Sequence, residues 1–141
     1  MKVQVVYTTH CKDAKILADD MARYARTYAK PLTDFDFHED IDLLVIGFEE
    51  YPCLKDKELE KFISQLSREH IHNLALFNLF CFKEKQMNHV IQLCQKANLP
   101  LMRETYSCKK SLKRKGVLSD DIISGGRVYI EDMVNLCLHY Y

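Results

Sequence analysis

The sequence lacks an excess of charge of either sign, because 20 Lys and Arg residues balance 20 Asp and Glu residues. Long-range attraction to nucleic acid or to an anionic membrane is therefore not built into the molecule as a whole, and we expect neither as a partner. No stretch approaches the ~20 apolar residues that a membrane-spanning helix requires. The amino terminus also has too short an apolar run for a signal peptide, so we expect a cytoplasmic protein.

The sequence also lacks the local motifs of several enzyme and metal-binding classes. Its six cysteines form no CxxC pair, which removes local support for a zinc ribbon or a thioredoxin-type site. We find no P-loop, no nucleophile elbow and no HExxH motif. In a cytoplasmic protein the cysteines are expected to be reduced thiols. The sequence therefore assigns no catalytic residue and no metal site.

What the sequence does contain is the composition of a globular domain. Of its 141 residues, 48% are apolar and 28% are charged, which excludes a disordered or low-complexity chain. There is no internal repeat and no linker, so we expect a single domain over residues 1–141.

Short apolar runs typical of buried strands alternate along the chain with segments of helical periodicity. The strand-like runs are Lys2–Tyr7, Thr33–Phe37, Asp42–Phe48, Asn73–Phe80 and Leu101–Ser107. The helical segments are Asp13–Tyr28, Asp56–Leu66, a third that carries Met87 to Ala97 and ends at Asn98, and Val128–Tyr140. The stretch between the last strand and the last helix, Cys108–Arg127, is expected to be irregular. This alternation predicts an α/β fold with a doubly wound, five-stranded parallel sheet and helices on both faces.

The first loop of the predicted sheet is a candidate phosphate site. Ligands of such sheets bind beyond the carboxyl ends of the strands, and this loop leads into the N-terminus of a helix, whose free amides favour anions. Its side chains add donors from Thr8, Thr9, His10 and Lys12. The alternative is an ordinary polar turn with Asp13 as the helix cap, because the loop has no glycine to let the backbone approach a phosphate closely.

Three segments resemble flavodoxins: VVYTTHCKDAKILADDMA (residues 5–22), IDLLVIGFEEYPCLKDKELEKFISQL (41–66) and NLALFNLFCF (73–82). They are similar, in that order, to the opening strand, loop and helix of the family, to its third strand with an aromatic-bearing loop and helix, and to its fourth strand with the second loop beside the flavin. The resemblance implies a flavodoxin-like three-layer sandwich with the strand order 2-1-3-4-5 and non-covalently bound FMN.

The resemblance also implies which residues would hold the cofactor. The phosphate would lie on the first loop, at Thr8, Thr9, His10, Cys11 and Lys12, and the ring would lie near Tyr51, Asn78 and Phe80. The family's threonine, glycine, asparagine and threonine stand here as Cys11, Lys12, Asp13 and Ala14. This exchange removes a hydroxyl and a glycine and adds a carboxylate, for which Lys12 can compensate as a point charge. We therefore expect FMN to bind more weakly than the complete family loop would allow.

Two functions of different classes remain open from the sequence. The first is an FMN-binding electron carrier that exchanges electrons with a redox partner protein. The alternative is a flavodoxin-fold accessory module that has lost the flavin and acts through a protein partner. Neither is a stand-alone enzyme.

The cysteines and one basic run are further candidates. Four cysteines each follow a different predicted strand and are expected on one rim beside His10: Cys11, Cys53, Cys81 and Cys108. They are either a metal-binding or redox-sensitive cluster, or small thiols at the edge of the core. Cys94 and Cys137 fall on the apolar stripes of helices, so thiol reagents are expected to label mainly the rim group. The basic run Lys109–Lys115 is either a grip for a phosphate or an acidic partner, or a solvated loop.

Overall fold

The computed structural model of the chain describes residues 1–50, 57–81, 84–110 and 118–140. Five parallel strands form one sheet in the order β2-β1-β3-β4-β5, which confirms the predicted doubly wound topology. The strands are β1 (Val3–Tyr7), β2 (Ala29–Pro31), β3 (Leu43–Glu49), β4 (Leu74–Phe80) and β5 (Leu101–Lys109). The helices are α1 (Lys12–Tyr24), α2 (Lys57–Gln65), α3 (Lys85–Lys96) and α4 (Asp120–Tyr140), with a short 3-10 turn, η1, at Leu32–Asp34.

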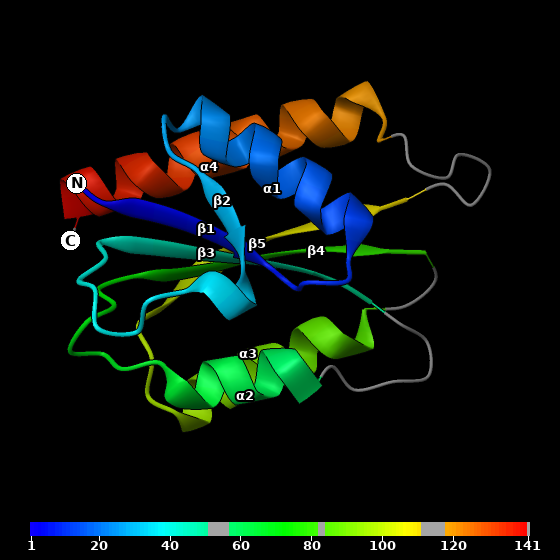
Figure 1. The fold of residues 1–141 in the computed structure, drawn as a ribbon. Helices are drawn as coiled ribbons and strands as arrows, with labels where there is room; N and C mark the ends of the chain where they lie inside the picture. The colour runs from blue at the N-terminus through cyan, green and yellow to red at the C-terminus, as the bar shows by residue number, and fades with distance from the viewer. Residues whose placement is uncertain (51–56, 82–83, 111–117, 141) are drawn as a thin grey trace.

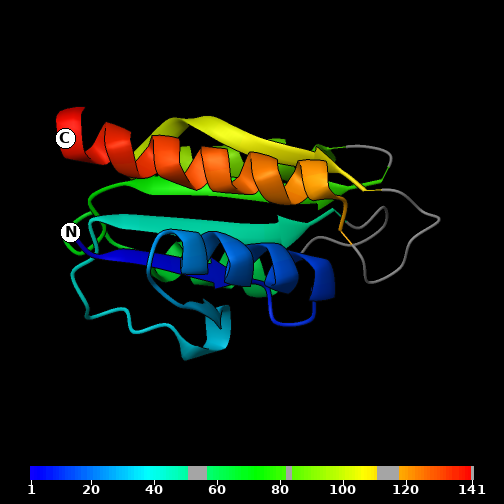
Figure 2. The ribbon, with the colours of Figure 1, turned by 90° about the horizontal axis from the view of Figure 1, so that it is seen from above.

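The helices cover both faces of the sheet, as Figure 1 shows. Helices α1 and α4 lie side by side on one face, and α2 and α3 lie on the other (Figures 1 and 2). The central strand β3 is buried at every position. Because successive strand residues point to opposite faces, Leu43 and Val45 pack with α1 and α4, whereas Leu44 and Ile46 pack with α2 and α3. This two-sided burial explains why the strand is a near-continuous apolar run.

The second strand lies earlier in the chain than predicted. Residues Ala29–Pro31 pair with the end of β1, whereas the predicted strand, Thr33–Phe37, begins inside η1. The alternation of this segment has another cause, since Phe35 and Phe37 pack on Phe62 of α2 with ring centroids 5.1 and 5.3 Å away. Aromatic packing onto a helix and strand alternation leave the same pattern in the sequence.

Helix α1 ends four residues before the predicted end at Tyr28. Arg26 adopts a positive φ of 61°, and the amide of Thr27 donates to the carbonyl of Ala22 at 2.8 Å, which is a left-handed helix termination. Tyr28 is 87% exposed and therefore does not belong to the apolar stripe. The predicted end of the third helix is confirmed, because Asn98 has a φ of 55° after α3.

Helix α4 begins at Asp120, eight residues before its predicted start, and runs through two glycines expected to lie in an irregular stretch. The glycines allow close packing. A Cβ on Gly125 would lie 2.3 Å from the hydroxyl oxygen of Tyr106, and one on Gly126 would lie 2.9 Å from Leu17 of α1. The low helix propensity of glycine suggested a loop, but tertiary packing against β5 and α1 outweighs it.

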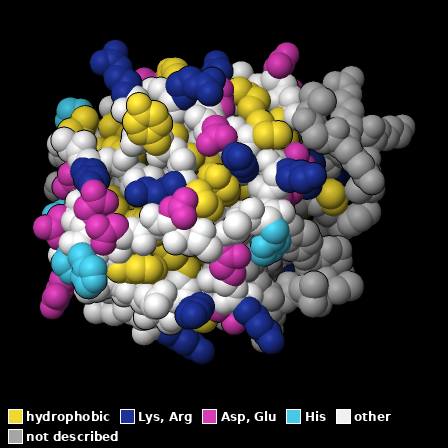
Figure 3. All heavy atoms as spheres, viewed as in Figure 1, with side chains coloured by type: hydrophobic (Ala, Val, Ile, Leu, Met, Phe, Trp, Pro, Cys, Tyr) yellow, Lys and Arg dark blue, Asp and Glu magenta, His cyan; other side chains and the backbone are white. Residues whose placement is uncertain are grey.

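No helix in the described part of the chain is long and apolar enough to span a membrane. On the face of the molecule in Figure 3, basic and acidic side chains are interspersed. This mixture agrees with the formal net charge of +0.

Candidate functional site

The candidate site lies at the carboxyl ends of the strands, where the loop of residues 8–11 connects β1 to α1. The amide of Thr8 donates to the carbonyl of Gly47 on β3, and the amide of Cys11 donates to the carbonyl of Thr8, both at 3.1 Å. Helix α1 begins after Cys11, its N-cap residue, without a side-chain hydrogen bond at the cap. The alternative in which Asp13 caps the helix is therefore wrong in that detail, because Asp13 lies inside the first turn. Thr8 is fully buried, and no hydrogen-bond partner for its Oγ1 lies within the described residues.

A carboxylate from the opposite face of the sheet occupies this loop. Glu58, in the first turn of α2, accepts a hydrogen bond from the Thr9 hydroxyl and a longer one, of 3.4 Å, from the Thr9 amide. Its second oxygen lies 3.5 Å from Nδ1 of His10. The amide and hydroxyl donors of Thr9 and the imidazole of His10 therefore converge on one carboxylate, and in this structure that carboxylate belongs to the protein.

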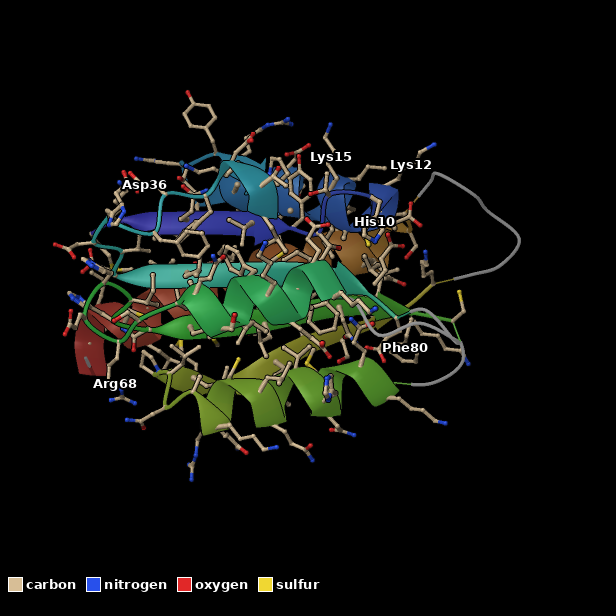
Figure 4. The ribbon with its side chains drawn as sticks, turned by 60° about the horizontal axis from the view of Figure 1, so that its bottom comes forward. His10, Lys12, Lys15, Asp36, Arg68 and Phe80 are labelled. Atoms are coloured by element: carbon tan, nitrogen blue, oxygen red, sulfur yellow. The ribbon has the colours of Figure 1, made fainter. Side chains whose placement is uncertain are left out.

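The structure brings together some of the predicted phosphate ligands and separates others. Thr8, Thr9 and His10 lie within one turn of chain, as expected. Cys11 is only 1% exposed and forms the N-cap of α1. Lys12 is exposed and extends from the start of α1 into solvent (Figure 4), so its ammonium group does not lie over the loop in this conformation.

The carboxylate of Asp13 is paired with a lysine. Nζ of Lys110, directly after β5, lies 2.9 Å from Oδ2 of Asp13 and also bonds the carboxylate of Glu49 at the end of β3. Burial by itself lowers the pKa of Lys110, but the hydrogen bonds and charges of Glu49 and Asp13 outweigh this effect and raise it. Lys110 of the predicted basic run thus belongs to a partly buried ion-pair network, and residues 111–115 of that run lie outside the described residues. The like charge expected from Asp13 is compensated by Lys110.

A second carboxylate closes the N-terminus of α3. Glu50 accepts hydrogen bonds from the amides of Gln86 (2.6 Å) and Met87 (2.9 Å) and from the side-chain amide of Asn78 (3.1 Å). Burial raises the pKa of Glu50, and these hydrogen bonds partly oppose that rise. Asn78 is fully buried, and its Oδ1 meets no donor from the described segments. The predicted ring-side residue Asn78 is therefore already committed in part to a protein contact.

Of the two aromatic residues predicted to flank a flavin ring, the structure places one, Phe80. Phe80, the last residue of β4, is partly buried and lies at the same sheet edge as the first loop (Figure 4). Tyr51 lies outside the described residues, so its predicted stacking remains a prediction.

The four predicted rim cysteines do not form an accessible group. Cys11 and Cys108 are buried at the core edge, Cys81 is partly exposed, and Cys53 lies outside the described residues. The expected labelling of the whole rim is therefore wrong for Cys11 and Cys108. The inward placement of Cys94 and Cys137 is confirmed by their burial. Within the segments that the structure describes, no group of three His, Cys, Asp or Glu side chains could hold a metal ion.

We expect thiol reagents to modify Cys81 first among the five described cysteines. Burial raises the pKa of Cys94 to about 12 and that of Cys108 and Cys137 to about 11, and a thiolate is the reactive form. Peptide mapping after brief iodoacetamide treatment of the native protein at pH 8 measures the order. Modification of Cys94 before Cys81 would contradict the helix packing described above.

Comparisons with known proteins bear on the fold. No family model matches the sequence, and no curated protein matches it either. Solved structures do match. A flavodoxin from the domain Archaea superimposes with a TM-score of 0.79 over 99% of this chain and 100% of its own, at 14% identity. This chain has a flavodoxin-like fold. A flavodoxin from Streptococcus pneumonia superimposes with a TM-score of 0.74 over 96% of this chain and 99% of its own, at 11% identity. Flavodoxin 2 from Bacillus cereus superimposes with a TM-score of 0.72 over 96% of this chain and 99% of its own, at 10% identity.

Three carboxylates of the candidate site were missed by the sequence analysis: Glu49, Glu50 and Glu58. The first two follow the apolar run of β3 directly, so their place at the carboxyl end of a central strand was open to prediction. Glu58 gave no such indication, because it is 49 residues from Thr9 in the sequence and its helical position is typical of an exposed acidic residue.

Proposed function

We propose that this flavodoxin-like protein binds FMN, with the phosphate on the first loop, and carries electrons to and from a partner protein. The observation that carries the proposal is the convergence of the Thr9 donors and the His10 imidazole on one carboxylate. A donor set that holds a carboxylate is chemically suited to a phosphate, which offers more acceptor oxygens.

Three further features of the loop and its surroundings support a phosphate. Helix α1 presents an N-terminus without a side-chain cap, and helix amides and the helix dipole favour an anion there. The hydroxyl of Thr8 is a buried donor that lacks a partner within the described part of the chain, an arrangement that normally costs stability. The ion pair between Asp13 and Lys110 also reduces the negative charge that a phosphate would meet. The phosphate end of FMN therefore fits this loop once Glu58 withdraws.

The protein's own contribution is to position the flavin and control its surroundings. Bound FMN would supply the electron-transfer chemistry, and Phe80 offers an aromatic side chain at the same sheet edge. The predicted partner protein and the cytoplasmic location remain proposals.

The accessory-module function is the second candidate, and one observation favours it. In this structure the carboxylate of Glu58 accepts hydrogen bonds from the first loop, and that of Glu50 accepts them from the amides at the N-terminus of α3. Two places where an anion could bind are therefore occupied by side chains of the protein. A protein that no longer binds a cofactor would be stable in this arrangement.

We expect Thr8→Val to weaken FMN binding about tenfold, a factor that corresponds to ~1.4 kcal/mol, while stabilising the protein without ligand by about 1 kcal/mol. Valine keeps the shape of threonine and removes the hydroxyl that lacks a partner. Quenching of flavin fluorescence measures the first effect and urea denaturation the second. Thr33→Val, at an exposed position of η1, is the matched control and should change neither quantity. If the wild type shows no saturable quenching at high micromolar FMN, the accessory module replaces the electron carrier.

A further inference from the structure

We infer that Glu58 is a built-in competitor of the flavin phosphate, whose carboxylate occupies the phosphate donors and makes the site discriminate against phosphorylated ligands. This inference rests on the proposed function, because it assigns to one residue the control of FMN binding at the same loop. It is specific to the phosphate end of the ligand and predicts no effect on the ring.

The contacts of Glu58 are those that a phosphate would make. Both carboxylate oxygens are engaged, one by the hydroxyl and amide of Thr9 and the other by the imidazole of His10. The side chain reaches the loop from α2, which covers the face of the sheet opposite to α1 (Figure 1). Ligand and carboxylate therefore cannot use the same donors at once.

Neighbouring carboxylates have other partners and do not compete for these donors. Asp13 and Glu49 share the ammonium group of Lys110, and Glu50 is held by the amides at the start of α3. Glu60, two residues after Glu58 on the same helix, pairs with His89 at 2.6 Å. Glu58, in contrast, contacts Thr9 and His10 of the first loop.

Glu58 is also placed so that it can leave. Its side chain is 29% exposed, and a partly exposed carboxylate regains water when it moves outward, so the cost of its release is small. Once released, it remains a like charge close to the phosphate dianion, and this repulsion lowers affinity further. Both effects act on phosphorylated ligands and leave riboflavin, which has the same ring without the phosphate, unaffected.

The test compares Glu58→Gln with the wild type in fluorescence titrations with FMN and with riboflavin. We expect FMN to bind the variant about tenfold more tightly, which corresponds to ~1.4 kcal/mol, and riboflavin to bind both proteins equally. With FMN set at its own Kd for each protein, inorganic phosphate should displace FMN from the variant at about tenfold lower concentration than from the wild type. Glu60→Gln is the control for loss of one charge from the same helix and should behave as the wild type. Glu58→Ala, which cannot accept from Thr9, should tighten FMN binding at least as much as Glu58→Gln.

The outcomes separate the inference from the function on which it rests. Equal FMN affinities for the wild type and both Glu58 variants would overturn the inference and leave the FMN proposal standing. Equal tightening of FMN and riboflavin would also overturn it, because the effect would not pass through the phosphate. If neither the wild type nor any variant binds FMN, the proposed function fails and the inference fails with it. Binding by the Glu58 variants alone would support both.

Discussion

Gly47→Val is expected to abolish cooperative folding or to remove more than ~3 kcal/mol of stability. An ideal Cβ on Gly47 would lie 2.0 Å from Cζ of Phe77 and within 2.6 Å of both of its Cε atoms. Phe77 is fully buried and is the register partner of Gly47 on β4, so its ring has no free volume into which to move. Overpacking of a rigid core typically costs about 1–3 kcal/mol of stability. Because the new Cβ would lie far inside the van der Waals distance of the Phe77 ring, we expect the cost of Gly47→Val to reach or exceed the upper end of that range.

A compensating change tests this packing account. Gly47→Ala should destabilise strongly, and Phe77→Leu should destabilise by creating a void. Combined, the two should be less destabilising than their sum, because the smaller side chain vacates the space that the new Cβ requires. Urea denaturation of the two single variants and the double variant measures the coupling. Strict additivity would contradict the close approach of Phe77 to Gly47.

Lys110→Met is expected to cost about 3 kcal/mol at pH 7, because it leaves Glu49 buried without its cation. Glu49 is only 5% exposed, and Asp13, the other partner of Lys110, adds a second negative charge nearby. Lys109→Met is the matched control. It is the adjacent residue, it is exposed, and its loss should change stability by less than 0.5 kcal/mol, as is usual for an isolated surface position.

The pH dependence of the wild type follows from the same network. The folded pKa of Lys110 is raised above its ordinary value of 10.5, so folding stabilises the protonated form. This contribution is fully present below that ordinary value and is lost as the pH rises through the folded pKa. Urea denaturation between pH 10 and 12 should therefore show a steeper loss of stability in the wild type than in Lys110→Met. Equal alkaline slopes in the wild type and the variant would contradict the assigned ion pairs.

The sequence predicted the fold well for strands and helices in which burial of one or both faces requires apolar side chains at regular positions. The apolar run of β3 and the helical stripes of α1 and α3 gave the alternation of elements, and the parallel sheet follows from it. The predicted element boundaries were wrong where interactions other than strand or helix burial explain the same kinds of residues. The alternation of Thr33–Phe37 reflects aromatic packing on Phe62, and the early start of α4 depends on close contacts of Gly125 and Gly126 with residues distant in the sequence.

The site was predictable only in part, for a related reason. The place of Thr8, Thr9 and His10 at the end of the first strand follows from local order along the chain. The partners of this region do not, because Glu58 reaches Thr9 and His10 from α2 and Lys110 reaches Asp13 from the end of β5. The ion pairs of Lys110 and the insertion of Glu58 are tertiary contacts. The sequence analysis could name a charge near the phosphate but assigned it to Asp13 instead of Glu58.

The measurement that tests the central claim most directly is an amide proton–nitrogen NMR titration of the labelled protein with FMN and, separately, with riboflavin. We predict that FMN shifts the amide resonances of Thr9, His10 and the first turn of α1, and that riboflavin leaves these resonances in place. This pattern would locate the phosphate on the first loop. Saturable FMN binding that leaves the first-loop amides unshifted, or the absence of any shift at millimolar FMN, would contradict the account.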